Sequence, residues 1–139
     1  MKLADYDAVC RIWKTTEGMC MEDDDRRERI FLYLRRNAGL CFVAVDAKKI
    51  IGTVLCGHDG RRGIMRHLAV LPKYRGQGIG KKLVRVSLDA LAAAGILKCN
   101  IFVMDDNVAG MKFWEHLDFV RLADNYRTLQ HGTGKKLRR

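Results

Sequence analysis

Apolar residues recur along the chain with two different spacings, and these predict a mixture of helices and strands. Val9, Ile12 and Trp13 are three and four residues apart, a spacing typical of one face of an amphipathic helix. The same pattern predicts helices over residues 4–16, 25–36, 79–94 and 107–117. Short apolar runs bounded by turn residues predict strands over residues 40–45, 50–56, 64–70 and 99–104, and a last hairpin over 119–123 and 127–130.

The order of these elements indicates the fold class. Two helices come first, antiparallel hairpin strands follow, and strand–helix–strand crossovers complete the chain. This order predicts a three-layer mixed α/β domain. Because the chain has 139 residues and no recognisable linker, repeat or low-complexity segment, we expect a single domain over residues 1–139.

The composition narrows the class of protein. Apolar residues make up 48% of the chain and charged residues 30%, as in folded soluble proteins. No apolar run reaches the roughly 18 residues needed to span a bilayer, and the first residues lack the apolar stretch of a signal peptide. We therefore expect a cytoplasmic protein without a membrane partner. The five cysteines are scattered without metal-ligand spacing, so we expect reduced thiols and no metal.

The charge balance points to an anionic partner. The formal net charge is +10, which is typical of proteins that bind an anionic ligand, an acidic protein or nucleic acid. Seven of the cations fall between Arg61 and Lys82. The sequence contains no recognised nucleic-acid-binding motif, and the aromatic residues are placed as core residues rather than as a stacking face. Nucleic acid is therefore the weakest of these alternatives.

A glycine-rich stretch, residues 74–82, stands between the strand predicted at 64–70 and the following helix. Its sequence is Tyr-Arg-Gly-Gln-Gly-Ile-Gly-Lys-Lys. Glycine allows close approach of the backbone to a ligand, and a helix N-terminus presents free N–H groups and partial positive charge to a phosphate. The third glycine is misplaced for a Gly-x-Gly-x-x-Gly dinucleotide site, and the spacing also fails for a P-loop. The loop therefore predicts a site for a phosphate-bearing ligand that is neither a dinucleotide site nor a P-loop.

Two segments together resemble the GNAT superfamily of acetyl-CoA-dependent N-acetyltransferases. The first is Arg75-x-x-Gly78-x-Gly80, which follows Leu68-Ala69-Val70-x-Pro72. The second, residues 107–119, is similar to the family's Asn-x-x-Ala-x-x-Phe-Tyr-Glu-x-Leu-Gly-Phe segment. The resemblance covers roughly residues 4–134. It implies a mostly antiparallel sheet with one splayed parallel pair of strands, about four helices, and acetyl-CoA as co-substrate.

The resemblance also implies which residues hold acetyl-CoA. The pantetheine arm would lie along the strand that ends at Val70, and the backbone of the glycine loop would bind the pyrophosphate. The implied cofactor-binding residues are Leu68, Ala69, Val70, Arg75, Gly76, Gln77, Gly78, Ile79, Gly80, Lys81, Asn107 and Phe113. A backbone N–H near Val70 would polarise the thioester carbonyl, and an acceptor amine would attack it directly.

The chain departs from the family pattern where catalysis is concerned. Trp114 stands at the position of the Tyr that serves many relatives as general acid, and Phe102 at that of a Glu base. Deprotonating a lysine amine at pH 7 costs roughly 4–5 kcal/mol, but an α-amino group only about 1 kcal/mol. A chain without an obvious base therefore favours low-pKa amines or a water relay. His67 is the best candidate base; His58, Asp105 and Asp106 are weaker candidates.

Several readings remain open at this point. The acids at 22–25 either cap the second helix or bind a cationic substrate. The family's first edge strand is nearly missing, which makes pairing with a second copy plausible. The leading function is N-acetyl transfer from acetyl-CoA to a primary amine of a small molecule or protein. The alternatives are a non-catalytic acyl-CoA-binding module and, less favoured, a nucleic-acid-binding protein.

Overall fold

The computed structural model describes residues 1–122, 128–130 and 133. It contains two compact units, Met1–Phe102 and Val103–Arg139. In the described residues, no helix combines the length and hydrophobicity that crossing a bilayer requires.

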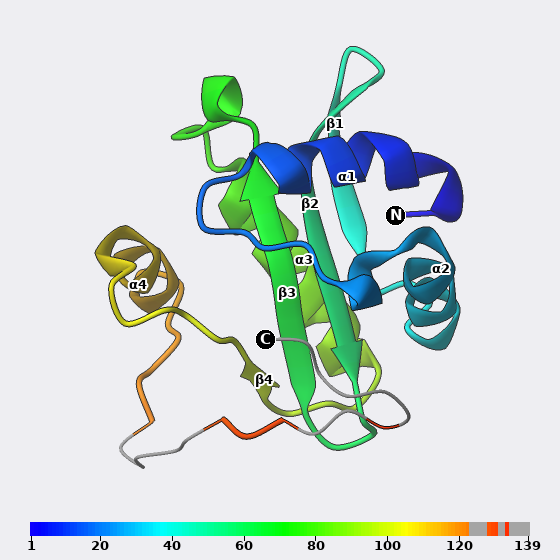
Figure 1. The fold of residues 1–139 in the computed structure, drawn as a ribbon. Helices are drawn as coiled ribbons and strands as arrows, with labels where there is room; N and C mark the ends of the chain where they lie inside the picture. The colour runs from blue at the N-terminus through cyan, green and yellow to red at the C-terminus, as the bar shows by residue number, and fades with distance from the viewer. Residues whose placement is uncertain (123–127, 131–132, 134–139) are drawn as a thin grey trace. The chain divides into compact units, whose positions relative to one another are not determined.

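The first unit is a four-stranded sheet covered by helices on both faces (Figure 1). Its strands are β1 (Phe42–Asp46), β2 (Lys49–His58), β3 (Gly63–Val70) and β4 (Cys99–Asn100). They lie in sequence order in the sheet, with β1–β2 and β2–β3 antiparallel and β3–β4 parallel. Helices α1 (Tyr6–Thr15) and α2 (Arg27–Arg36) cover one face, and α3 (Ile79–Ala93) covers the other. The predicted three-layer mixed α/β architecture is confirmed.

The core follows from the periodicity of the sequence. Val9, Ile12 and Trp13 of α1 are all buried, as their spacing predicts, and they pack with Leu55 of β2 and Ala69 of β3. On the opposite face, the apolar positions of α3 pack against the sheet, and Leu83 and Leu91 are buried. The long central strand β2 is therefore covered on both faces, which holds β3 in place beside it.

The strand expected at 99–104 is much shorter than predicted. Only Cys99 and Asn100 pair with β3, opposite Gly63 and Ile64. The apolar composition also suggested burial, but the exposed fractions of Phe102 and Met104 are 66% and 71%. Because the parallel ladder ends after two residue pairs, the following apolar side chains have no strand partner to pack beside. The early end of the ladder agrees with the splayed parallel pair that the family resemblance implies.

Two other expectations change in detail. The second helix begins after a separate 3₁₀ turn, Asp23–Asp25, so the side chain of Asp25 does not cap α2. The second unit contains α4 (Val108–Glu115), as predicted, followed by residues 119–122 and 128–130 without strand structure. The predicted final hairpin is thus not seen in these residues, and its positions 123–127 lie outside the described part of the chain.

Strand β3 contains a bulge beside α1. Thr53 pairs with Ala69 and Leu55 pairs with Arg66, so His67 and Leu68 together oppose the single residue between Thr53 and Leu55. His67 has a φ of +53°, an unusual value for a residue other than glycine. A bulge re-aims the side chains at its position. Here it places the His67 ring against α1.

Candidate active site

The N-terminus of α3 supplies free backbone donors. The N–H of Lys82 donates to the carbonyl oxygen of Gly78 at 3.0 Å, the first bond of the helix. Gly78 is the N-cap residue and provides no side-chain acceptor. The three preceding N–H groups, those of Ile79, Gly80 and Lys81, consequently have no partner within the helix. Together with the helix dipole they form a site suited to a phosphate group.

Two glycines keep this end of the helix open. Gly76 and Gly78 have φ values of +75° and +79°, in the left-handed region that glycine alone adopts without strain. No heavy atom lies within 4 Å of the position that a Cβ atom would take at either residue. The backbone of the loop is therefore accessible to a ligand from outside. This is the arrangement that the spacing of the glycines predicts.

The end of β3 offers a second set of backbone groups. The N–H of Leu71 donates to the carbonyl oxygen of Ile51, toward β2. Because successive residues of a strand direct their polar groups to opposite sides, those of Val70 face the side of β4. The β3–β4 ladder ends at Ile64, well before Val70. The Val70 carbonyl accepts a hydrogen bond from Arg75 Nε at 2.9 Å, and in the described part of the chain no strand pairs with Val70 on this side.

Tyr74 ends the 3₁₀ turn Pro72–Tyr74, which joins β3 to the glycine loop. Its partial burial and the nearby Asp46 carboxylate, at the end of β1, raise the pKa of the Tyr74 hydroxyl.

These groups fit the coenzyme that the sequence implies. The predicted coenzyme-binding residues lie in three consecutive segments. Strand β3 ends with Leu68, Ala69 and Val70, the loop contains Arg75, Gly76, Gln77 and Gly78, and the first turn of α3 contains Ile79, Gly80 and Lys81. A ligand with an extended polar arm can pair with the free edge of β3, and its phosphates can meet the unpaired N–H groups of α3. Exposed cationic side chains, among them Lys81 and Lys82, surround this end of the helix.

His67 lies on β3 in a half-buried position, where its ring contacts the side chains of Asp25 and Trp13. Its Nε2 atom is 2.8 Å from Oδ1 of Asp25. The exposed fractions of the two side chains are 18% and 11%. The edge of the His67 ring also meets the ring of Trp13, with centroids 4.8 Å apart. An imidazole that is held by a carboxylate and still partly open to solvent is suited to accept and release a proton.

Asp25 has a different role in the structure from the one that its place in the sequence predicts. Local pattern presents it as a helix cap or as part of an acidic substrate site. In the structure its carboxylate is buried and faces an imidazole 42 residues away. The only sequence signal for this pair is the presence of an acid in the loop between α1 and α2. No short-range spacing identifies its partner.

The other candidate bases have different surroundings. His58 Nδ1 accepts the N–H of Gly60 within the β2–β3 turn. Asp105 and Asp106 are exposed and precede α4. Phe102 is exposed, and the Arg66 guanidinium lies 5.4 Å from its ring centroid. Among the candidate bases, His67 has the contacts that a proton-accepting group needs.

The second unit contains the other two predicted coenzyme contacts. Asn107 caps α4, because its Oδ1 accepts the N–H of Gly110 at 2.9 Å. The ring of Trp114 packs edge-on against Phe113 and Phe119. Trp114 is therefore part of a small aromatic cluster. The roles of Asn107 and Phe113 in binding coenzyme remain predictions.

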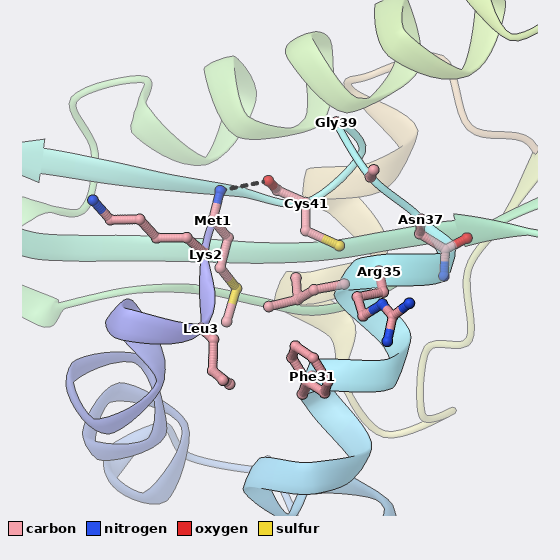
Figure 2. A pocket seen from close by; sticks show the side chains of 10 residues that line it. Met1, Lys2, Leu3, Phe31, Arg35, Asn37, Gly39 and Cys41 are labelled. Carbon is pink, nitrogen blue, oxygen red and sulfur yellow. Dashed lines mark hydrogen bonds between the residues drawn. The ribbon is translucent and has the colours of Figure 1, made fainter.

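A cavity of about 280 Å³ lies apart from the glycine loop, between the chain start and the C-terminal end of α2 (Figure 2). Its walls include Leu3, Phe31, Arg35 and Cys41. The Met1 ammonium group donates to the Cys41 carbonyl at 2.8 Å. The cavity thus adjoins the start of β1, which is the edge strand of the sheet. It contains none of the residues predicted to bind coenzyme or to catalyse.

Comparisons of the sequence with known proteins agree on one family. The sequence model described as the acetyltransferase (GNAT) family matches residues 6–119. N-alpha-acetyltransferase 30 of Schizosaccharomyces pombe is 39% identical over 97 residues, which are 66% of this chain and 65% of that protein. The chain thus spans slightly less than two thirds of that relative. An acetyltransferase of Sodalis glossinidius is 31% identical over 115 residues, covering 83% of this chain and 80% of that protein.

Solved structures are similar in fold. Ard1 from Thermoplasma volcanium has a TM-score of 0.78 at 20% identity, covering 88% of this chain and 81% of that one. The PaiA N-acetyltransferase from Thermoplasma acidophilum, solved in complex with coenzyme A, has a TM-score of 0.71 at 18% identity and covers 84% of each chain. At these identities the likeness concerns the arrangement of helices and strands.

Proposed function

Because this chain belongs to the acetyltransferase (GNAT) family, we propose that it transfers the acetyl group of acetyl-CoA to a primary amine. Relatives named as N-acetyltransferases support an amine as the acceptor. We propose direct attack of the amine in a ternary complex. The acceptor is a small molecule or the amine of a protein, and its class has to be found by experiment.

One observation carries the proposal: the free edge of β3 leads directly into the open N-terminus of α3. Val70 ends the strand well beyond the last β3–β4 pair, and the N–H groups of residues 79–81 follow after the glycine loop. A coenzyme A molecule would pair with the strand edge and place its pyrophosphate on the helix N-terminus. It would supply the thioester whose acetyl group is transferred. The Val70 N–H would polarise the thioester carbonyl, as an oxyanion-hole donor does.

We propose His67 as the base. The acceptor ammonium loses a proton to the His67 imidazole, and the nitrogen lone pair then attacks the acetyl carbonyl carbon. The new N–C bond forms as the C–S bond breaks, with its electron pair leaving on sulfur. The second nitrogen proton passes to that sulfur, which yields the amide and free coenzyme A thiol. Solvent takes up the proton that His67 accepted.

The experiment has a binding step and a chemical step. Titration calorimetry with acetyl-CoA measures binding, and thiol release over a panel of amines, peptide N-termini and polyamines measures transfer. We expect binding together with thiol release for at least one acceptor class. Absence of heat and of a thermal shift at millimolar acetyl-CoA would overturn the proposal. Binding without thiol release from any amine would instead support the non-catalytic acyl-CoA-binding alternative, which the Phe102 and Trp114 substitutions favour.

A further inference from the structure

Both carboxylate oxygens of Asp25 have fixed partners. Oδ1 is 2.8 Å from Nε2 of His67, and Oδ2 accepts the N–H of Glu22 at 3.0 Å. The Asp25 carbonyl oxygen also accepts the Tyr6 hydroxyl at 2.7 Å. Asp25 is therefore held by α1 and by its own 3₁₀ turn, and it has little freedom to rotate away from the imidazole.

The His67 ring is held from two more directions. Its backbone adopts a left-handed conformation within the β3 bulge, and its ring packs edge-on against the buried Trp13. A left-handed conformation is strained for a residue other than glycine. Such strained positions are retained where the surrounding structure determines them, often at functional sites. The bulge, Trp13 and Asp25 together determine where the ring points.

We propose that Asp25 is a positioning residue that fixes the tautomer of His67, a role that rests on the acetyl transfer proposed above. A carboxylate accepts hydrogen bonds and donates none, so the proton of the neutral ring belongs on Nε2. Nδ1 is then the atom left to accept the proton of the acceptor amine. Asp25 also stabilises the imidazolium that forms when Nδ1 takes that proton. The carboxylate itself transfers no proton.

A purely structural role explains the pair less well. A buried ion pair is often no more stabilising than apolar residues of the same volume. The same unit contains a matched turn that needs no such pair. In the 3₁₀ turn Leu3–Asp5, Asp5 Oδ2 accepts the N–H of Lys2 at 2.8 Å, as Asp25 Oδ2 accepts that of Glu22. The backbone N–H contact alone is therefore enough to close a 3₁₀ turn of this kind. The contact between Asp25 and His67 is not needed to close the turn.

The substitution Asp25→Asn replaces one of the two carboxylate oxygens by an NH₂ group. The Glu22 N–H requires an acceptor, so the amide oxygen takes that side and the amide NH₂ faces His67 Nε2. His67 must then place its proton on Nδ1, which removes the acceptor that the reaction uses. We expect kcat to fall about 100-fold or more, within the range of a general base contribution, with little change in KM. The control Asp5→Asn alters the same kind of turn without a histidine partner, and we expect wild-type kcat.

The tautomer is measured directly by long-range ¹H–¹⁵N correlation spectra at pH 8, with the His67 signals assigned by their loss in His67→Gln. We expect the Nε2–H form in the wild type and in Asp5→Asn, and the Nδ1–H form in Asp25→Asn. A wild-type ring protonated on Nδ1 would overturn the proposal, whether or not Asp25→Asn folds. So would a folded Asp25→Asn protein with unchanged kcat. A wild type that releases no thiol refutes the proposed function, whereas the tautomer measurement still decides the role of Asp25.

Discussion

The Arg75 side chain folds back onto the strand that precedes it, and its Nε atom donates to the Val70 carbonyl oxygen at 2.9 Å. The 3₁₀ turn Pro72–Tyr74 lies between the two residues. The contact joins the end of β3 to the start of the glycine loop. Arg75 is exposed, so the two terminal nitrogens of its guanidinium remain available to a phosphate. One side chain can therefore fix the loop and bind the ligand.

Replacing Arg75 separates these two roles. Arg75→Lys keeps the charge but lacks the guanidinium, in which Nε bonds Val70 while the separate terminal nitrogens face the ligand, and Arg75→Ala loses both contacts. Hydrogen bonds to charged groups contribute about 1.5–3 kcal/mol, so we expect acetyl-CoA affinity to fall roughly 10–100-fold in Arg75→Ala and by a smaller factor in Arg75→Lys. Calorimetry measures both. Lys73→Ala removes an exposed cation from the neighbouring turn and should change acetyl-CoA affinity only slightly. An equal loss of affinity in Lys73→Ala would show that Arg75 contributes only its positive charge.

The two ends of α3 provide a matched pair of glycines. Gly78 and Gly95 both have a φ of +79°, and neither has an atom within 4 Å of its Cβ position. Substitution by alanine should cost roughly 1–2 kcal/mol of folding free energy at each site. Only Gly78→Ala should also weaken acetyl-CoA binding, by about 10-fold or more, because its methyl group occupies the approach of the phosphate. Urea denaturation and calorimetry of the two variants test this, and equal affinities would show that Gly78 serves the turn alone.

Much of the fold is predictable because its causes are local. The spacing of Val9, Ile12 and Trp13 predicts the buried face of α1, and the glycine loop is a contiguous motif whose residues stay together in the structure. The length of β4 is not local. It depends on where the parallel pairing with β3 ends, and the apolar run up to Met104 gives no sign of that point.

The sequence points to His67 as a candidate base, from its place on the strand that leads to the glycine loop. It does not point to the side chain that contacts His67. Short-range pattern alone predicts that Asp25 caps a helix, because acidic residues just before a helix commonly serve as caps. Its contact with His67 requires that the loop between α1 and α2 packs over the bulge of β3, an arrangement set by the burial of α1 and Trp13. Tertiary packing therefore decides a role that short-range spacing leaves open.

The β2–β3 turn should respond to acid through Asp59. Its Oδ1 accepts the backbone N–H groups of Arg62 at 2.9 Å and Arg61 at 2.8 Å, and these bonds lower the pKa of the carboxyl. The folded pKa is below the unfolded one, so the stabilisation is present above about pH 3.9 and is lost as pH falls through the folded value. Asp59→Ala should lower the urea midpoint at pH 7, and the difference from wild type should disappear toward pH 2. The exposed acid Asp89 serves as control at pH 7, because Asp89→Ala removes a carboxylate from the middle of α3 rather than from a turn and should not lower the urea midpoint in the same way.

The backbone of His67 predicts which substitutions the bulge tolerates. Asparagine adopts φ values near +53° more readily than most residues, whereas a β-branched residue is strained there. We expect His67→Asn to be more stable than His67→Val by about 1–2 kcal/mol, and the Asn amide can also donate to the buried Asp25. Both variants lack the imidazole, so thiol release should fall in both by about 100-fold or more. Equal stability of the two variants would show that the bulge relaxes. Retained activity in His67→Asn, the better folded of the two, would remove His67 from the chemistry.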